Sequence, residues 1–222
     1  MNNAKFGQVD NFTQLANNFG EQIEHWNGVD VNVSARMANG LNLSGGTSTG
    51  RTSTDNCEIL AQLPEISVNG LPYCHQDTNW LTQVKATASY RIRRIDVQTS
   101  GAFQSLPGSA IAANWAVNNA IVAPSLGRNL SGSQANTTVN MVEPGTEYGE
   151  RLNQFDFRVG KILRFGSARA TVSLDLYNAF NASTVLSQNN NYVPVTGGLA
   201  TWQVPTLILQ ARFVKISTQF EW

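Results

Sequence analysis

The last residues of the chain, Arg212-Phe-Val-Lys-Ile-Ser-Thr-Gln-Phe-Glu-Trp222, alternate between apolar and polar side chains. Because successive side chains of a β-strand point to opposite faces, this stretch predicts a strand with one apolar and one polar face. The apolar face carries Val214, Ile216, Thr218, Phe220 and Trp222. Taken alone, the pattern fits two structures: an edge strand of a soluble sheet, or a transmembrane strand that ends on an interfacial aromatic residue.

The composition favours β-structure with an uncharged polar surface. The 222 residues are 41% hydrophobic and only 14% charged, whereas soluble proteins average roughly 25% charged residues. Asn, Thr, Ser, Gln and Gly fill the difference. Helical bundles use Lys and Glu freely, so this mixture argues against them. The net charge is zero, so we expect no nucleic-acid partner. The sequence contains no run of eighteen apolar residues, so it predicts no transmembrane helix.

The same alternation recurs along the chain in pairs of segments that are joined by short turns. The turns fall at Asn39-Gly40, Arg93-Arg94 and Gly166-Ser167, and Asn-Gly is the strongest short hairpin signal. We therefore expect principal strands at residues 23–37, 41–48, 81–92, 95–103, 152–165, 170–177 and 212–222.

Long polar connections follow each short turn, at residues 50–79, 106–150 and 181–205. Connections of this length are uncommon inside compact soluble domains, whereas outer-membrane barrels have short periplasmic turns and long extracellular loops. The predicted fold class is therefore all-β: an antiparallel up-and-down transmembrane β-barrel segment of about seven or eight strands, in a single unit over residues 1–222. Two apolar runs inside the second connection, Trp115–Val122 and Thr138–Val142, are candidates to pair with each other.

The N-terminus predicts a segment of a longer protein. It shows no basic region followed by an apolar core, as a signal peptide would. Seven principal strands are an odd number, whereas bacterial single-chain barrels have an even number. We interpret residues 1–21 as the remnant of an extracellular loop.

The two cysteines, Cys57 and Cys74, both lie in the first long connection. A disulfide between them would stabilise the fold by about 3 kcal/mol in the entropic description and would require an oxidising compartment. Two free thiols are the alternative. A metal site with the adjacent His75 is also conceivable, but the spacing lacks a second close pair of ligands.

Several stretches resemble the C-terminal end of TonB-dependent outer-membrane receptors, in particular the Oar-like receptors that carry an N-terminal carboxypeptidase-regulatory-like domain. The stretches are Arg151-Leu-Asn-Gln-Phe-Asp-Phe-Arg-Val-Gly-Lys161, Ser173-Leu-Asp-Leu-Tyr-Asn-Ala-Phe-Asn181, Leu126-Gly-Arg128, Val142-Glu-Pro-Gly-Thr146, and the residues Trp202, Pro205, Arg212 and Trp222. The resemblance covers most of the chain and is strongest from Gly145 onward.

This resemblance implies a bacterial outer-membrane location and a role in energised substrate uptake. Such receptors close a barrel around an N-terminal plug and engage TonB through a short segment, and the barrel-assembly machinery reads their aromatic-ended last strand. The expected partners are therefore outer-membrane lipid, the assembly machinery, the plug and remaining strands of the full-length receptor, and TonB only through that full-length protein. The segment alone is expected to be inactive in transport.

No motif predicts catalysis or a cofactor. The stretch Gly45-Gly-Thr-Ser-Thr-Gly-Arg-Thr52 approximates a phosphate-binding loop, but Arg51 replaces the required Lys and no helix-forming segment follows. The chain has two histidines, His25 and His75, and neither a catalytic triad nor a paired-carboxylate signature can be assembled around them.

Asp156, Arg158 and Asp175 fall on the polar faces of adjacent predicted strands, so we expect a lumenal polar cluster there. Its role is either contact with a plug or substrate, or simple ion pairing in a hydrated lumen.

Two other functions stay open. A small self-contained barrel could act as a surface adhesin if an eighth strand, at Thr184–Tyr192 or Trp115–Val122, completed it. A soluble carbohydrate-binding β-sandwich is the third hypothesis, and it requires a second layer to cover the apolar faces.

Overall fold

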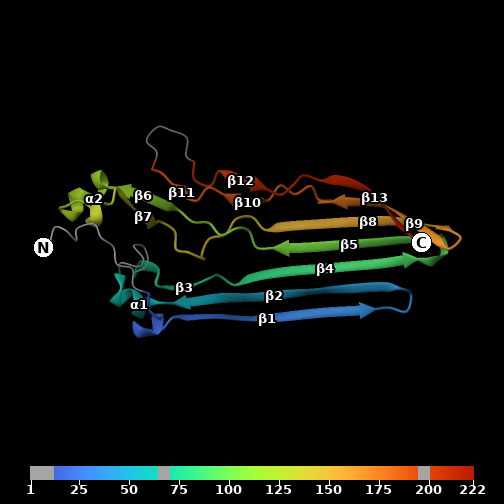
Figure 1. Ribbon diagram of the computed structural model, residues 1–222, viewed down its shortest axis with the longest axis horizontal. Helices are drawn as coiled ribbons and strands as arrows, with labels where there is room; N and C mark the ends of the chain where they lie inside the picture. The colour runs from blue at the N-terminus through green and yellow to red at the C-terminus, as the bar shows by residue number, and fades with distance from the viewer. Residues whose placement is uncertain (1–12, 65–70, 195–200) are drawn as a thin grey trace.

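A long antiparallel sheet dominates the computed structural model, which describes residues 13–64, 71–194 and 201–222 (Figure 1). From edge to edge its strands are β1 (Ile23–Arg36), β2 (Leu41–Asp55), β4 (Leu81–Ile92), β5 (Val97–Leu106), β8 (Leu152–Phe165), β9 (Ala168–Tyr177) and β13 (Phe213–Glu221). The short strand β3 (His75–Asp77) pairs with β2 off this path. The predicted antiparallel all-β architecture is confirmed.

The sheet is open in the described part of the chain. Each neighbouring pair of strands is antiparallel, so β1 and β13, at the two edges, run in the same direction. These two edge strands do not pair with each other. The short turns and the C-terminus lie at one end of the sheet, and the long connections lie at the other end (Figure 1).

Backbone conformation explains the short turns. Gly40 (φ +92°) and Gly166 (φ +60°) adopt left-handed conformations that closing a tight turn requires. The third turn is the 3-10 helix η5 (Arg93–Ile95), which ends at Asp96 with φ +47°. Ile95, which the alternation placed in a strand, therefore belongs to the turn.

The first long connection is shorter than predicted. β2 continues to Asp55, which lies opposite Ile23 of β1, so the loop prediction is wrong for residues 50–55. This part of β2 is polar on both faces, and the apolar stripe that identifies a strand from sequence is absent from it. The connection also contains α1 (Cys57–Gln62), the 3-10 helix η4 (Leu71–Tyr73) and β3.

The other two long connections form small sheets of their own. β6 (Asn114–Asn118) pairs with β7 (Asn136–Asn140), so the predicted pairing inside residues 106–150 is confirmed in part. The second half of the predicted run, from residue 119, forms α2 (Asn119–Leu126), because the side chain of Asn118 caps the helix by accepting a hydrogen bond from the backbone N–H of Ile121.

The connection between β9 and β13, predicted over residues 181–205, extends further and contributes three short strands to these small sheets. β10 (Val185–Gln188) pairs with β12 (Pro205–Ile208), and β11 (Asn191–Tyr192) pairs in parallel with β6. Within the described residues neither candidate for an eighth strand joins the main sheet. Of the loop predicted over residues 1–21, residues 1–12 lie outside the described part, and the rest contains the 3-10 helix η2 (Ala16–Asn18).

The register of the main sheet separates the side chains into a polar face and an apolar face. One row of cross-strand partners crosses all seven strands on the polar face: Arg36, Asn42, Ser89, Ser100, Arg158, Asp175 and Lys215. The neighbouring row lies on the apolar face: Ala35, Leu43, Ala88, Gly101, Phe157, Leu176 and Val214. Directly opposed residues share a face of the sheet, so each row is a continuous surface.

The apolar face is exposed. Val31 is 51% exposed, Leu174 51% and Ile216 73%. Among the described residues the fully buried apolar side chains are Ile59, Leu60, Ala113, Val117 and Ala170, and only Ala170 belongs to the main sheet. Most of the apolar surface of this sheet therefore lies outside any core. None of the helices in the described ranges is long and apolar enough to cross a bilayer.

Candidate functional site

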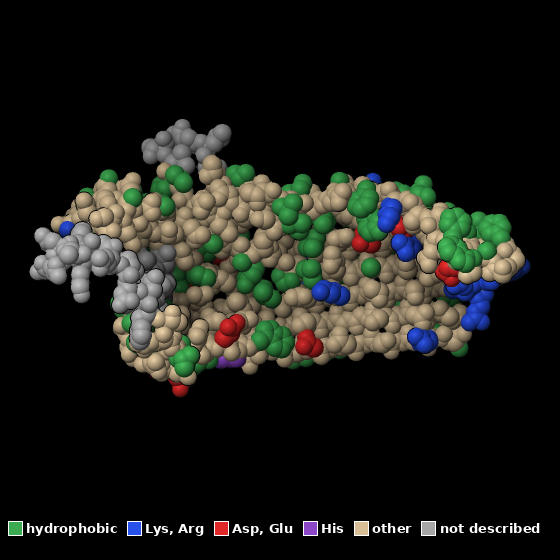
Figure 2. Space-filling view, viewed as in Figure 1, with side chains coloured by type: hydrophobic (Ala, Val, Ile, Leu, Met, Phe, Trp, Pro, Cys, Tyr) green, Lys and Arg blue, Asp and Glu red, His purple; other side chains and the backbone are tan. Residues whose placement is uncertain are grey.

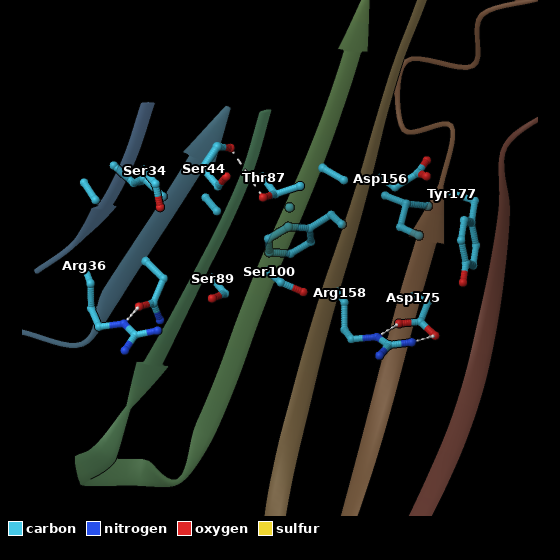
Figure 3. A pocket seen from close by; sticks show the side chains of 18 residues that line it. Ser34, Arg36, Ser44, Thr87, Ser89, Ser100, Asp156, Arg158, Asp175 and Tyr177 are labelled. Atoms are coloured by element: carbon cyan, nitrogen blue, oxygen red, sulfur yellow. Dashed lines mark hydrogen bonds and ion pairs between the residues drawn. The ribbon is translucent and has the colours of Figure 1, made fainter. Parts of the chain in front are cut away.

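A groove of about 460 Å³ crosses the polar face of the main sheet from β1 to β9. Figure 3 labels most of its polar side chains: Ser34, Arg36, Ser44, Thr87, Ser89, Ser100, Asp156, Arg158, Asp175 and Tyr177. Hydroxyl groups line the middle strands β2, β4 and β5, and the charged side chains lie on the flanking strands. This distribution follows from the two-residue period of each strand, which places every second residue in the groove.

Arg158 of β8 and Asp175 of β9 form the ion pair at one side of this groove (Figure 3). The guanidinium donates from Nε to Oδ1 and from Nη2 to Oδ2, and the second contact is 3.0 Å long. The side chain of Asp175 is 4% exposed and that of Arg158 is 50% exposed. Lys215 lies opposite Asp175 on the other side, in β13. The buried carboxylate is therefore flanked by cations on both neighbouring strands.

Asp156 has different partners from those of Asp175, although it lines the same groove. Its Oδ1 accepts hydrogen bonds from the side-chain amide of Gln154, at 3.0 Å, and from the backbone N–H of Asn178, at 2.8 Å. The three residues of the predicted polar cluster thus share one face and one groove. Two of them form the ion pair, while Asp156 fixes the start of the segment that follows β9.

Asn178 organises that segment, and the sequence reasoning did not identify it. It is 2% exposed. Its side-chain amide nitrogen donates to the carbonyls of Ala182 and Gln210, and its side-chain oxygen accepts from the N–H of Ala182. Asn178 (φ +48°) and Asn181 (φ +53°) both adopt left-handed conformations, which Asn tolerates better than most residues. The two Asn residues in Asn178-Ala-Phe-Asn181 were the available sequence signal for a turn at this point.

Most of the groove hydroxyls are free to bind water or a polar ligand. Thr87 donates from Oγ1 to the carbonyl of Ser44, at 3.4 Å. The side-chain hydroxyls of Ser34, Ser89 and Ser100 have no hydrogen-bond partner among the described residues. A wall of short hydroxyl side chains leaves room against the sheet and offers both donors and acceptors. The groove can therefore hold a hydrated surface or a polar polypeptide.

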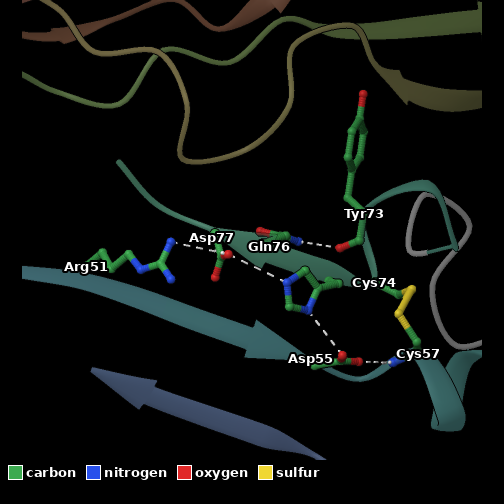
Figure 4. Close-up of polar contacts among 8 residues, drawn as sticks. Arg51, Asp55, Cys57, Tyr73, Cys74, Gln76 and Asp77 are labelled. Carbon is green, nitrogen blue, oxygen red and sulfur yellow. Dashed lines mark hydrogen bonds and ion pairs between the residues drawn. A yellow bond between two sulfur atoms is a disulfide. The ribbon is translucent and has the colours of Figure 1, made fainter. Parts of the chain in front are cut away.

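A second polar cluster lies beside the disulfide at the opposite end of β2 (Figure 4). Cys57 and Cys74 are bridged, with their Cα atoms 4.7 Å apart. Next to the bridge, the Nδ1 atom of His75 lies 3.1 Å from an oxygen of Asp55, and its Nε2 atom lies 3.7 Å from an oxygen of Asp77. This chain of contacts ties β3 to the end of β2.

Arg51 extends the same cluster toward the main sheet. Its guanidinium lies 3.5 Å from Asp77 and stands over the ring of Trp80, 5.8 Å from the centroid. The metal site considered for Cys57, Cys74 and His75 is contradicted, because both sulfurs are in the disulfide. In residues 13–64, 71–194 and 201–222, no group of three or more His, Cys, Asp or Glu side chains is arranged to hold a metal ion.

The remaining sequence candidates lie in regular strands. Residues 45–52, which approximate a phosphate-binding loop, lie inside β2, and β1 pairs with all of them. The residues that follow this stretch continue the same strand. The stretch therefore lacks the helix N-terminus that would bind a phosphate. His25 lies in β1 opposite Ser53.

The residues predicted to form the assembly signal lie at the edge of the sheet. Val214, Ile216, Thr218 and Phe220 alternate along β13 on the apolar face. Trp222 follows the strand and is 98% exposed.

No protein-family model and no curated protein matches this chain.

Proposed function

We propose that this sheet is part of the wall of an outer-membrane β-barrel, as the C-terminal strands of a TonB-dependent receptor that takes up a substrate with energy from the inner membrane. The observation that carries the proposal is the uncovered apolar face that runs across all seven strands. In water such a face would be a liability, because large exposed apolar patches promote association. Against hydrocarbon the same face is stable.

The dimensions of the strands support this placement. A tilted transmembrane strand needs about 9–11 residues. β1, β2 and β8 have 14, 15 and 14 residues, so each is long enough to cross a bilayer and to extend beyond it. Residues 50–55 of β2 are polar on both faces. They lie at the end of the sheet where the long connections are, and there a transmembrane strand would project into water.

The polar face supports a hydrated lumen. Its short hydroxyl side chains and the Arg158–Asp175 pair line a groove and do not form a packed core. In the receptor proposed here, the groove faces the plug or the substrate path. Transport, the plug and the contact with TonB belong to the full-length receptor.

The open edges support a role as one part of a larger wall. β1 and β13 run in the same direction, so they cannot close a barrel by antiparallel pairing with each other. An odd number of further strands must lie between them to complete an antiparallel barrel. This requirement argues against the self-contained adhesin, because neither candidate for an eighth strand joins the sheet. The soluble sandwich would need a second layer over Val31, Leu174 and Ile216, which are all at least half exposed.

Matched substitutions on the two faces of β1 test the proposal. Val31 lies on the apolar face and its neighbour Asn32 on the polar face. Arg at the centre of a lipid-facing strand costs about 2–4 kcal/mol, whereas lumenal positions tolerate charge. We expect Val31→Arg to lower the amount of full-length protein in the outer-membrane fraction, and Asn32→Arg to leave it close to normal.

Other outcomes would redirect the assignment. Equal levels for the two variants would reject a lipid-facing sheet. Recovery of the unmodified protein in the soluble fraction would favour the carbohydrate-binding sandwich. Insertion of this chain by itself as a heat-modifiable barrel would favour the adhesin.

A further inference from the structure

The apolar face contains a groove of about 710 Å³ over β2, β4 and β5. Its floor includes small residues that the register brings together from three strands: Gly45, Ala86, Ala88 and Gly101. Phe103, next to Ala86, and Leu43, next to Ala88, flank them and also line the groove. Elsewhere this face carries large side chains, for example Leu174 and Ile216. The groove is therefore a local depression in an apolar surface.

Larger apolar side chains form the two walls. Val31 and Val33 of β1 lie along one side, and Phe155 and Phe157 of β8 lie along the other. The two phenylalanine rings are stacked, with centroids 6.4 Å apart. Phe155 also leans over Gly101, because a Cβ atom placed there would lie 3.1 Å from the ring. The absence of a side chain at Gly101 thus sets the position of one wall.

The backbone of the floor restricts what can lie in this groove. Gly45 pairs with Val33 on one side and Ala86 on the other, and Ala88 pairs with Leu43 and Gly101. The peptide groups of the floor strands are thus engaged in the sheet, so an extended peptide cannot add to them as a strand. The occupant must need no hydrogen bonds from the floor, and a hydrocarbon chain meets this condition.

The turn just beyond the end of the groove is basic, although Arg93 also borders a separate hollow with Arg36 and Arg91. Tyr90 lines the groove, and Arg93 and Arg94 follow in η5, where both are exposed. Neither has an ion-pair partner among the described residues, whereas Arg91 and Arg164 both pair with Asp96. Figure 2 shows basic side chains gathered at this end of the molecule. Arg side chains are well suited to bind phosphate through charge-assisted hydrogen bonds.

The length of the groove matches one leaflet of a bilayer. From Val84 to Tyr90 the strand β4 rises by roughly 20 Å, at about 3.3 Å per residue. Transmembrane strands tilt by about 45°, so this length covers about 14 Å of membrane depth, and half of the roughly 30 Å hydrocarbon core is about 15 Å. An acyl chain that lies in the groove would therefore place its headgroup at the level of η5.

We propose that this groove holds one phospholipid of the leaflet bounded by the short turns, with an acyl chain over Gly45, Ala86, Ala88 and Gly101 and the phosphate on Arg93 and Arg94. This inference rests on the proposed function, because it requires the apolar face to lie in a bilayer. It goes further in naming a lipid that stays bound when the surrounding lipids are removed.

Lipid retention by the full-length protein tests this site. The protein is extracted from membranes in a mild detergent and purified, and its phospholipid is measured by native mass spectrometry and phosphorus content. We expect about one retained phospholipid per chain. The double substitution Arg93→Gln and Arg94→Gln should lower retention on the order of tenfold, because two cationic contacts to the headgroup are lost.

A substitution inside the groove tests the acyl-chain contact independently of charge. Ala88→Phe fills the floor and should also lower retention. Matched controls are Arg128→Gln, an exposed arginine outside the main sheet, and Val172→Phe, which adds the same ring to the apolar face at β9. Arg128→Gln and Val172→Phe should both retain lipid as the unmodified protein does.

The possible results separate the two proposals. Membrane-located protein that retains no phospholipid, or variants of Arg93, Arg94 and Ala88 that retain it normally, would overturn the lipid site and leave the barrel assignment standing. Recovery of the unmodified protein in the soluble fraction would overturn both. Retention lost in the arginine variant and in Ala88→Phe, but in neither control, would support the site.

Discussion

Arg158 donates two hydrogen bonds to Asp175 across β8 and β9, but the guanidinium is far more exposed to water than the carboxylate. The side chain of Asp175 is 4% exposed and that of Arg158 is 50% exposed. The carboxylate has therefore lost most of its hydration and depends on the guanidinium, whereas the guanidinium keeps half of its surface in water. This asymmetry makes the two residues unequal in their contribution to stability.

Substitution of Arg158 should lower the free energy of unfolding more than substitution of Asp175. Arg158→Met leaves a buried carboxylate without its main partner, a loss of about 1–3 kcal/mol. Asp175→Asn leaves a half-exposed arginine in water and should lower stability by under about 1 kcal/mol. Urea unfolding in detergent micelles measures both. Because Lys215 lies opposite Asp175, we expect Lys215→Met to increase the effect of Arg158→Met. Equal losses for the two single variants would contradict the asymmetry.

Trp26 should prevent the addition of a side chain at Gly50. A Cβ atom on Gly50 would overlap with the ring of Trp26, so Gly50→Ala must displace the ring. Overpacking of this kind costs about 1–3 kcal/mol. We expect the melting temperature of the folded form to fall for Gly50→Ala. The same substitution in a Trp26→Ala background should cost much less, and a full loss in that background would show that the ring is not the cause.

The last strand should determine the amount of protein in the membrane. Phe220 is 67% exposed and Trp222 is 98% exposed, so neither contributes to a core whose loss would explain a folding defect. If the assembly machinery reads this strand, the double substitution Phe220→Ser and Trp222→Ser in the full-length protein lowers outer-membrane levels. Ser217→Ala, on the polar face of the same strand, is the matched control. Unchanged levels in the double variant would count heavily against the receptor assignment.

The disulfide should protect the connection between β2 and β4 and have little influence on the main sheet. The bridge joins the start of α1 to the residue before β3, and a closed loop of this size is worth about 3 kcal/mol in the entropic description. We expect Cys57→Ser with Cys74→Ser to speed proteolytic cleavage between residues 56 and 80, as detected by mass spectrometry. Reduction of the unmodified protein should produce the same fragments. Identical cleavage with and without the bridge would show that the polar contacts of His75 suffice.

The turn at Asp96 should lose its ion pairs only in strong acid. Hydrogen bonds from Arg164 and Arg91 lower the pKa of Asp96 to about 2 from an ordinary value of 3.8. A carboxylate whose pKa is lowered by folding stabilises the folded state above its ordinary pKa, and this contribution disappears as the pH falls through the lowered value. The affected window is therefore about pH 4 to pH 2.

Asp96→Asn tests this pH dependence. Unfolding measured at pH 6 and at pH 2.5 should show a smaller difference for Asp96→Asn than for the unmodified protein, because the variant has no carboxylate to protonate there. The same difference in both proteins would assign the acid sensitivity to other carboxylates.

Much of the main sheet was predictable because side-chain alternation is a local property. Val29, Val31 and Val33, or Val214, Ile216 and Phe220, reveal a strand without reference to any partner. The end of β2 was not predictable in this way, because residues 50–55 are polar on both faces and form a strand only through pairing with β1 and β3. The switch from β6 to α2 was missed for a different reason: the side chain of Asn118 caps a helix inside a stretch that was interpreted as one apolar run.

The candidate site was predictable only in part. Alternation placed Asp156, Arg158 and Asp175 on one face, but the cross-strand register decided that Arg158 pairs with Asp175 and that Asp156 binds the backbone of Asn178. The burial of Asn178 depends on Ala182 and on Gln210, which lies 32 positions away along the chain.

By itself, the sequence determined that the chain forms ribbons with one apolar and one polar side, since a two-residue period leaves no other arrangement. The short turns also indicated three hairpins, but only the tertiary structure decided how these hairpins and β13 lie side by side. That arrangement also decided the open edges and the depression over Gly45, Ala86, Ala88 and Gly101. A groove made of small residues has no signature in any single strand, because it exists only where small residues from neighbouring strands come into register.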